Sequence, residues 1–348
     1  MTIDWRQLHA TSVVADAHND LLCAVVARPP DEWGAFFRQT WLPQLRSGGV
    51  DIQVLPVFID ETLRPEGALR QTLRMIECAR RIAAENPQDV ELCFTGADID
   101  AALAAGRIAL ILALESAPGI DEDVELFRTL HALGLRIASF AHFGRSPLAD
   151  GSGEDATGSR LTTTGVEALG LLEEIGVLVD LSHLGAAGVS HVLELATKPL
   201  IATHSSARAL RDHHRNLSDE QVKGIAATGG VICVNFFAPF LAESGATLDH
   251  LADHMEHLVS LAGVDRVGLG PDFVKEVQAD TKPAWCELSA TKLLGAKVEY
   301  LDGLEGPAGL PLVTEKLVAR GWDAGDIRKV LGENLRELFR ANFGTSKS

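Results

Sequence analysis

The sequence predicts an α/β protein whose fold is a (β/α)₈ TIM-type barrel with extra C-terminal helices. Short aliphatic runs alternate with longer segments of helical period, which is typical of parallel strands joined by crossover helices. Eight such units occur along the chain, the number that closes a barrel. The 348 residues exceed the ~250 of a typical barrel and leave room for long loops.

Each strand is predicted from a run of β-branched or aliphatic residues bounded by polar or turn residues. The runs are Val13–Ala17, Asp51–Phe58, Ile108–Leu114, Arg136–Ala141, Val177–Leu181, Leu200–Thr203, Val231–Asn235 and Arg266–Gly270. Helical patterns lie between them at residues 68–85, 123–134, 162–176 and 218–230, and closing helices are predicted at 310–321 and 323–343. No glycine-rich phosphate loop follows the first strand, which disfavours an open doubly wound sheet. Without a linker or an internal repeat, residues 1–348 are expected to form one domain.

Composition and charge exclude several classes of function. Acidic residues outnumber basic ones 48 to 31, for a net charge of −17, whereas nucleic-acid binding normally requires a basic surface. No apolar run approaches the ~20 residues that span a bilayer, and "MTIDWRQLHATS" lacks the pattern of a signal peptide. The five widely spaced cysteines indicate reduced thiols. We therefore expect a cytoplasmic protein with no nucleic-acid and no membrane partner.

Histidines and carboxylates follow six of the eight predicted strands. In a barrel, the carboxyl ends of the strands converge on one mouth, where such enzymes place their active sites. An imidazole and carboxylate set without thiolates suits Zn²⁺, Mn²⁺ or Fe²⁺, and zinc is the usual choice for hydrolysis. The residues are, in chain order, His18, Asp20, Glu115, His142, His183, His204 and Asp272.

These side chains are more numerous than the ligands that one ion needs. The natural division places His18 and Asp20 on one metal and His183 and His204 on a second, with Glu115 bridging the pair. Two metals about 3.5–4 Å apart can polarise a carbonyl and activate water at neutral pH. Any one of these side chains taken alone would more often be a hydrogen-bonded strand end. Their recurrence favours a metal centre that hydrolyses an amide or an ester.

Nine motifs in a fixed order carry a resemblance to a known family. They are "DAHND", "LALES", "FAHFGRSPLADG", "VDLSHLG", "PLIATHSSARAL", "HHRNLSD", "GGVICVNFF", "VGLGPDF" and "LGENLREL". Together they cover nearly the whole chain, which resembles the membrane (renal) dipeptidase family of zinc metallopeptidases, within the amidohydrolase-type barrels. The chain departs from the family pattern after Asp272, where it reads "DFVKEV" instead of Phe-Asp-Gly, and directly before Glu115, where the family glycine is replaced.

The resemblance implies a site and an activity. It implies two zinc ions per chain, hydrolysis of dipeptides that often tolerates a C-terminal D-residue, and in several members a homodimer. It makes Glu115 the bridging ligand and assigns His142 to the substrate carbonyl or tetrahedral oxyanion. It assigns Arg215 to the substrate's terminal carboxylate and Asp272 to proton transfer. The implied metal ligands are His18, Asp20, Glu115, His183 and His204.

Alternative functions use parts of the same sequence pattern. A lactonase, a cyclic amidase or a deaminase of the amidohydrolase type would use the same metals, but Arg215 favours a peptide because its guanidinium suits a free carboxylate. A Schiff-base aldolase or lyase needs a lysine at a strand end, and only Lys275 comes close. A non-catalytic barrel with structural metals is disfavoured by the intact Asp272.

Several other residues are expected to have structural roles or leave two interpretations open. Asp16 is either a hydrogen-bond partner behind the metal ligands or a buried structural carboxylate. His213 and His214 are expected at the surface, and Cys23 as a packed free thiol. The segment Lys275–Gly306 is either a lid or a variable loop. An exposed, charged helix face is expected for His250, His254 and His257.

Overall fold

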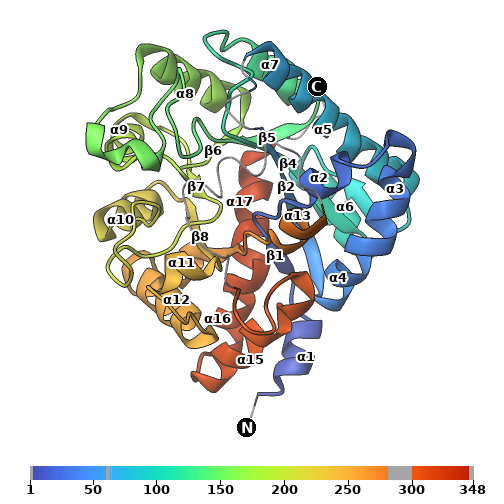
Figure 1. Cartoon of the computed structure of the whole chain (residues 1–348). Helices are drawn as coiled ribbons and strands as arrows, with labels where there is room; N and C mark the ends of the chain where they lie inside the picture. Colours follow the sequence, from blue (N-terminus) through green and yellow to red (C-terminus); the bar gives the residue numbers. More distant parts are fainter. Residues whose placement is uncertain (1–2, 60–62, 64, 281–299, 345–348) are drawn as a thin grey trace.

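Eight parallel strands form a closed ring in the computed structural model, which describes residues 3–59, 63, 65–280 and 300–344 (Figure 1). The order around the ring is β1-β2-β4-β5-β6 in one sheet and β7-β8-β9 in a second. The strands are β1 (Val14–Asp16), β2 (Val50–Phe58), β4 (Ile108–Glu115), β5 (Leu135–Ala138), β6 (Leu178–Val179), β7 (Ile201–Ala202), β8 (Val231–Asn235) and β9 (Val267–Gly270).

Isolated bridges join the two sheets into the barrel. Asp180 pairs with Ile201 beside β6 and β7, and Asn19 pairs with Phe273 beyond β1 and β9. The Ala17 amide also donates to the Leu269 carbonyl at 3.0 Å. Because the chain returns to its first strand, the carboxyl ends of all eight strands surround one mouth, and the predicted (β/α)₈ barrel is confirmed.

Helices surround the ring of strands and cover its outer face (Figure 1). Several begin and end at favourable residues: Thr162 caps α8 through a bond from the Gly165 amide at 3.0 Å, and Gly176 ends it with a left-handed backbone. The helices are α1 (Trp5–Ala10), α2 (Leu21–Val26), α3 (Trp33–Phe36), α4 (Leu42–Ser47), α5 (Glu66–Glu85), α6 (Gly96–Ala104), α7 (Leu126–Ala132), α8 (Thr163–Ile175), α9 (Ala186–Leu195), α10 (Asp219–Ala227), α11 (Ala238–Leu241), α12 (Leu248–Ala262), α13 (Lys275–Asp280), α15 (Pro311–Ala319), α16 (Ala324–Arg328) and α17 (Asn334–Asn342).

The C-terminal helix α17 seals the end of the barrel opposite the mouth. Aliphatic side chains inside the ring form one buried cluster, and Leu335, Leu338 and Phe339 of α17 pack into it. Gly332 precedes α17 and lies against the backbone of Val13 at the start of β1, where a side chain would collide. The barrel is therefore packed from its amino end, and its polar residues are left for the mouth.

The structure differs from the predicted elements in one strand and in strand lengths. The strand β3 (Val90–Leu92) was not predicted, and it pairs with the start of β4 outside the ring. The strands β6 and β7 have only two residues each, shorter than predicted. The predicted helix 323–343 is divided by a π-helical turn at Lys329–Glu333.

Further expectations concern the cysteines, the segment Lys275–Gly306 and membrane-spanning helices. Cys23, Cys78, Cys93 and Cys233 are buried, which agrees with the expected packing of Cys23, while Cys286 lies outside the described residues. Most of the segment Lys275–Gly306, at residues 281–299, also lies outside them. Among the described residues, no helix has the length and apolar character needed to cross a bilayer.

Candidate metal centre

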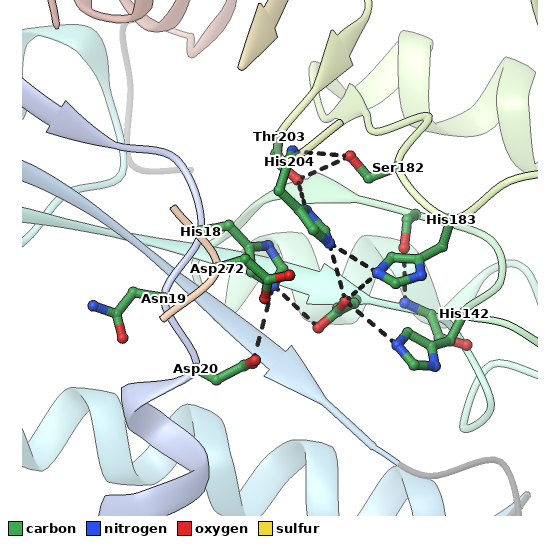
Figure 2. Close-up of polar contacts among 12 residues, drawn as sticks. His18, Asn19, Asp20, His142, Ser182, His183, Thr203, His204 and Asp272 are labelled. Atoms are coloured by element: carbon green, nitrogen blue, oxygen red, sulfur yellow. Dashed lines mark hydrogen bonds and ion pairs between the residues drawn. The ribbon is translucent and has the colours of Figure 1, made fainter. Parts of the chain in front are cut away.

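Side chains from six strand ends converge in the mouth of the barrel, as the sequence predicts (Figure 2). Three overlapping groups of potential ligand atoms lie there, each with all its atoms within 4.8 Å of one another. One group has His18 and Asp20 with Glu115, and another has His183 and His204 with Glu115. We call the first the β1 half and the second the β6–β7 half, after the strands that their other members follow.

Glu115 lies between the two halves with one carboxylate oxygen toward each. Its Oε2 is 3.3 Å from His18 Nε2, and its Oε1 is 3.1 Å from His183 Nε2 and 3.6 Å from His204 Nε2. The carboxylate is buried at the end of β4, in which all eight residues are buried. This is the arrangement that a bridging ligand requires.

The imidazoles of the cluster lie close together, and some of their polar neighbours lack hydrogen-bond partners. The Nε2 atoms of His183 and His204 are 2.8 Å apart, and the rings of His18 and His204 have centroids 3.6 Å apart. His18 Nε2 makes no aligned hydrogen bond, and Asp20 Oδ1 has no hydrogen-bond partner, within the described part of the chain. Buried polar atoms are rarely left unsatisfied, so this donor set fits a cation at its centre.

Backbone strain accompanies the site. Four residues other than glycine have a left-handed backbone within the described ranges, and three of them border the cluster. They are Ser116 at φ 63°, His183 at φ 68° and Asp272 at φ 61°. This region is unfavourable for residues with a Cβ and persists where the surrounding structure fixes it. Two of these residues, His183 and Asp272, belong to the groups of potential ligands, so the strained backbone accompanies side chains that lie in the mouth.

Asp272 follows β9 and belongs to a third group of ligand atoms, with His18 and His204. The Asn235 side-chain amide donates to Asp272 Oδ2 at 3.0 Å, and the Asp272 amide donates to the His18 carbonyl at 3.0 Å. One carboxylate oxygen is thereby held by the protein. The geometry accommodates Asp272 either as a proton carrier beside the metals or as a further ligand.

His142 and Arg215 approach the cluster from two other sides. His142 Nε2 lies 3.9 Å from Glu115 Oε1, and its ring packs against Phe58, Phe143 and His183. The Arg215 guanidinium is buried, and it donates to the His204 carbonyl at 2.6 Å and to Ser205 Oγ at 2.9 Å. Its Nε has no hydrogen-bond partner among the described residues and can donate to a bound molecule.

The surroundings of the two halves shift the pKa values of their histidines in opposite directions. Burial disfavours the charged form of His18, but the neighbouring carboxylates, Glu115 first, raise its pKa to about 10. Burial, together with neighbouring cations such as Arg215, holds the pKa values of His183 and His204 well below the usual range. His18 therefore retains a proton, whereas His183 and His204 are neutral.

The pKa values of the carboxylates in the cluster are also shifted in different directions. Burial and the charge of Glu115 raise the pKa values of Asp20 and Asp272. Burial also opposes ionisation of Glu115, but the charges of His18 and His142 outweigh it and lower the pKa of Glu115. Glu115 is thus the ionised centre of the cluster.

Buried polar groups lie behind the potential ligands, and of these only Asp16 is singled out by the sequence pattern. Asp16 accepts from the His18 amide at 2.9 Å, so it supports the loop that carries His18, and burial raises its pKa to about 7. Asp180, Thr203 and Ser182 form a hydrogen-bonded group behind His204. Their only signal in the sequence is their position beside the predicted ligands.

Two expectations about other histidines are corrected by the structure. His254 is buried rather than exposed: its Nδ1 accepts from the Ala207 amide and its Nε2 donates to the Leu241 carbonyl. His213 and His214 are half-buried rather than at the surface, because they stack on each other and His214 Nδ1 bonds with Ser152 Oγ. The prediction that His213 and His214 lie at the surface was therefore wrong.

Comparison with known proteins gives a consistent family. Residues 3–298 match the membrane dipeptidase family, Peptidase family M19. An uncharacterized dipeptidase of Schizosaccharomyces pombe is 30% identical over 293 residues, covering 77% of this chain and 70% of that protein.

The crystal structure of dipeptidase AC, an M19 metallopeptidase, is 26% identical with a TM-score of 0.84, covering 96% of this chain and all of that one. An amidohydrolase from Pseudomonas aeruginosa shares the fold, with 24% identity, a TM-score of 0.82, and coverage of 98% of this chain and 100% of that one. The chain, with its metal-binding His/Glu cluster, therefore belongs to the membrane dipeptidase family M19 and is a metallodipeptidase.

Proposed function

We propose that the protein hydrolyses dipeptides with two zinc ions, one in each half of the metal centre, bridged by Glu115. The observation that carries this proposal is the position of Glu115, with one carboxylate oxygen 3.3 Å from His18 Nε2 and the other 3.1 Å from His183 Nε2. When bound, such ions supply a Lewis acid for the scissile carbonyl and a water whose pKa is lowered toward neutrality.

Arg215 is the proposed site for the carboxylate of the dipeptide. The free Nε and the remaining N–H groups of this buried guanidinium can donate to a carboxylate next to the metal centre. A lactone or a cyclic amide offers no terminal carboxylate, so this contact favours a dipeptide over the substrates of other amidohydrolase-type enzymes. The charge of Arg215 also limits the length of the substrate, since the carboxylate has to follow the scissile bond closely.

His142 and Asp272 are the proposed groups for the chemical step. The His142 ring is held by aromatic packing and can donate a hydrogen bond to the carbonyl oxygen as negative charge develops on it. Asp272 has one oxygen held by Asn235, and its other oxygen can carry a proton to the departing amine nitrogen. An amine leaves readily only after it has accepted a proton, so this role is needed in the mouth.

The substrate range is expected to include a D-residue at the C-terminal position. The proposed contacts reach the carboxylate and the carbonyl, and neither group carries the C-terminal side chain. Discrimination between the two configurations at this position would therefore come from other parts of the mouth.

A substrate screen with metal analysis tests this proposal. Libraries of L-Xaa-L-Xaa and L-Xaa-D-Xaa dipeptides, with lactones and cyclic amides as competitors, are assayed with zinc-loaded and chelated protein. We expect zinc-dependent cleavage of dipeptides and two zinc ions per chain by elemental analysis. His183→Gln should lose zinc and activity, whereas the matched variant His257→Gln, at a half-buried histidine of α12 outside the metal centre, should lose neither. Zinc-dependent hydrolysis of lactones with no cleavage of dipeptides would overturn the proposed substrate, and a single ion would overturn the proposed centre.

A further inference from the structure

The two ring nitrogens of His204 have different surroundings. Nε2 faces the metal centre, 2.8 Å from His183 Nε2, whereas Nδ1 faces the barrel wall, 2.8 Å from Thr203 Oγ1. A neutral imidazole carries one proton, and only the nitrogen without it can bind a cation. The tautomer of His204 therefore decides whether Nε2 is available as a ligand.

The hydrogen bonds behind His204 fix the direction in which protons are donated. Asp180 Oδ1 accepts the amides of Ser182 at 2.9 Å and of Thr203 at 3.0 Å, and Asp180 Oδ2 lies 2.5 Å from Thr203 Oγ1. An ionised carboxylate only accepts, so the single hydroxyl proton of Thr203 goes to Asp180. The Thr203 oxygen then presents a lone pair to His204 Nδ1, which has to carry the proton.

We propose that Thr203 and Asp180 are positioning residues that hold His204 in the tautomer with a free Nε2. Asp180, Thr203 and His204 are all buried, with at most 5% of each residue exposed, so bulk water does not replace the hydroxyl bond. The inference rests on the proposed function only in that His204 ligates a cation. It adds two residues that do not touch the metals or the substrate.

The other histidine of this half lacks such a device. His183 Nδ1 has no hydrogen-bond partner within the described ranges, whereas its Nε2 lies 2.8 Å from His204 Nε2 and 3.1 Å from Glu115 Oε1, so no described group behind the ring holds a proton on Nδ1. Asp180 therefore acts on one ligand of the β6–β7 half and not on both. Ser182 adds a bond from the His204 backbone amide to its Oγ at 3.1 Å, which fixes the main chain but not the ring proton.

Substitutions of equal size separate the possible outcomes. Thr203→Val removes the hydroxyl, and Thr203→Ser keeps it. Asp180→Asn places an amide N–H next to the Thr203 oxygen, because its carbonyl oxygen stays with the two backbone amides. The hydroxyl then donates to His204 Nδ1, and the ring proton moves to Nε2. Thr72→Val is the matched control, since Thr72 is a buried threonine in α5 whose hydroxyl donates within its own helix, to the Ala68 carbonyl.

The test measures the tautomer and the zinc affinity separately. Long-range ¹H–¹⁵N NMR of ¹⁵N-histidine-labelled, metal-free protein should show His204 protonated at Nδ1 in the wild type and in Thr203→Ser. It should show protonation at Nε2 in Asp180→Asn. Competition with a chromophoric chelator should give zinc binding about 10- to 100-fold weaker in Thr203→Val and Asp180→Asn. Thr203→Ser and Thr72→Val should stay within about threefold of the wild type.

Two results would overturn the inference. One is a wild-type His204 protonated at Nε2, a measurement that needs no variant and so does not depend on whether Thr203→Val folds. The other is unchanged zinc affinity in folded Thr203→Val and Asp180→Asn. Failure of the proposed function would look different: the wild type would bind zinc with the expected tautomer but cleave no dipeptide.

Discussion

The β1 half and the β6–β7 half of the metal centre use the same kinds of ligand but are prepared for a cation in different ways. The β1 half combines one imidazole with two carboxylates, and its His18 has a pKa of about 10. The β6–β7 half combines two imidazoles with one carboxylate, and both of its histidines are held neutral by burial and neighbouring cations. A cation entering the first half has to displace a proton, whereas the second half presents ligands that are already deprotonated.

The difference follows from what lies behind each half. Asp16 supports the β1 half through the backbone amide of His18, and it does not contact the ring. Thr203 supports the β6–β7 half by a direct bond to the His204 ring, and Arg215 adds a positive charge beside it. The two-ion centre that we propose would therefore consist of two unequal halves joined by a shared carboxylate.

The largest effect is expected from removing that shared carboxylate. Glu115→Gln keeps the shape of the side chain but removes the charge that both halves use, so zinc content should fall in both. We expect kcat/KM to fall by about 10³-fold or more, equivalent to about 4 kcal/mol. Elemental analysis checks the first expectation and steady-state kinetics the second. Loss of only one ion would make Glu115 a terminal ligand and the halves independent.

Substitution of Asp272 should distinguish a role in proton transfer from a role in metal binding. If it carries the proton to the amine, Asp272→Asn should lower kcat by roughly 10²- to 10⁴-fold with both zinc ions retained. Kinetics and zinc analysis of the same preparation provide the test. Activity lost together with one zinc would instead make Asp272 a ligand that joins His18 and His204, and the division into two halves would need revision.

Arg215 should affect substrate recognition through its free N–H groups. A charge-assisted hydrogen bond is worth roughly 1.5–3 kcal/mol, so free dipeptides should exceed C-terminally amidated ones by about 10- to 150-fold in kcat/KM. Arg215→Met should abolish that preference. Because this variant also removes the bond to the His204 carbonyl, zinc content is measured alongside. A preference that survives in the zinc-loaded variant would remove Arg215 from the carboxylate site.

The pH dependence of zinc binding should distinguish the halves. Below the His18 pKa of about 10, each unit of rising pH should strengthen binding to the β1 half about tenfold, because a bound proton has to leave. Binding to the β6–β7 half should change less than about threefold per unit above pH 7, since His183 and His204 are neutral there. Chelator competition on His183→Gln reports the first half and on Asp20→Asn the second. Equal slopes in the two variants would contradict the assigned protonation states.

Much of the fold and the membership of the candidate metal cluster could be predicted from the sequence, because barrel strands are apolar runs and the polar residues at their ends stand out. The strand β3 was not predicted because Val90–Leu92 is short, contains the polar Glu91 and lies outside the ring. His254 was placed at the surface because Asp253 and Glu256 flank it in the sequence. Its helical spacing with Leu251 and Leu258, both buried, was the signal that could have placed it correctly.

The supporting groups were harder to predict for a physical reason. Thr203 and Asp180 meet only because the strands they follow are neighbours, paired at Asp180 and Ile201. The left-handed backbones of His183 and Asp272 result from tertiary packing and have no local sequence signature. Residues that hold ligands are therefore less visible in a sequence than the ligands themselves.

Calorimetric titration of the metal-free protein with zinc, in two buffers of different ionisation enthalpy, tests the unequal bridged centre most directly. The difference between buffers gives the number of protons released for each ion bound. Two ions per chain are expected at pH 7.5, with at least one proton released on filling the β1 half and close to none on filling the other. A single ion, or two ions that release equal numbers of protons, would contradict a centre built from two unequal halves.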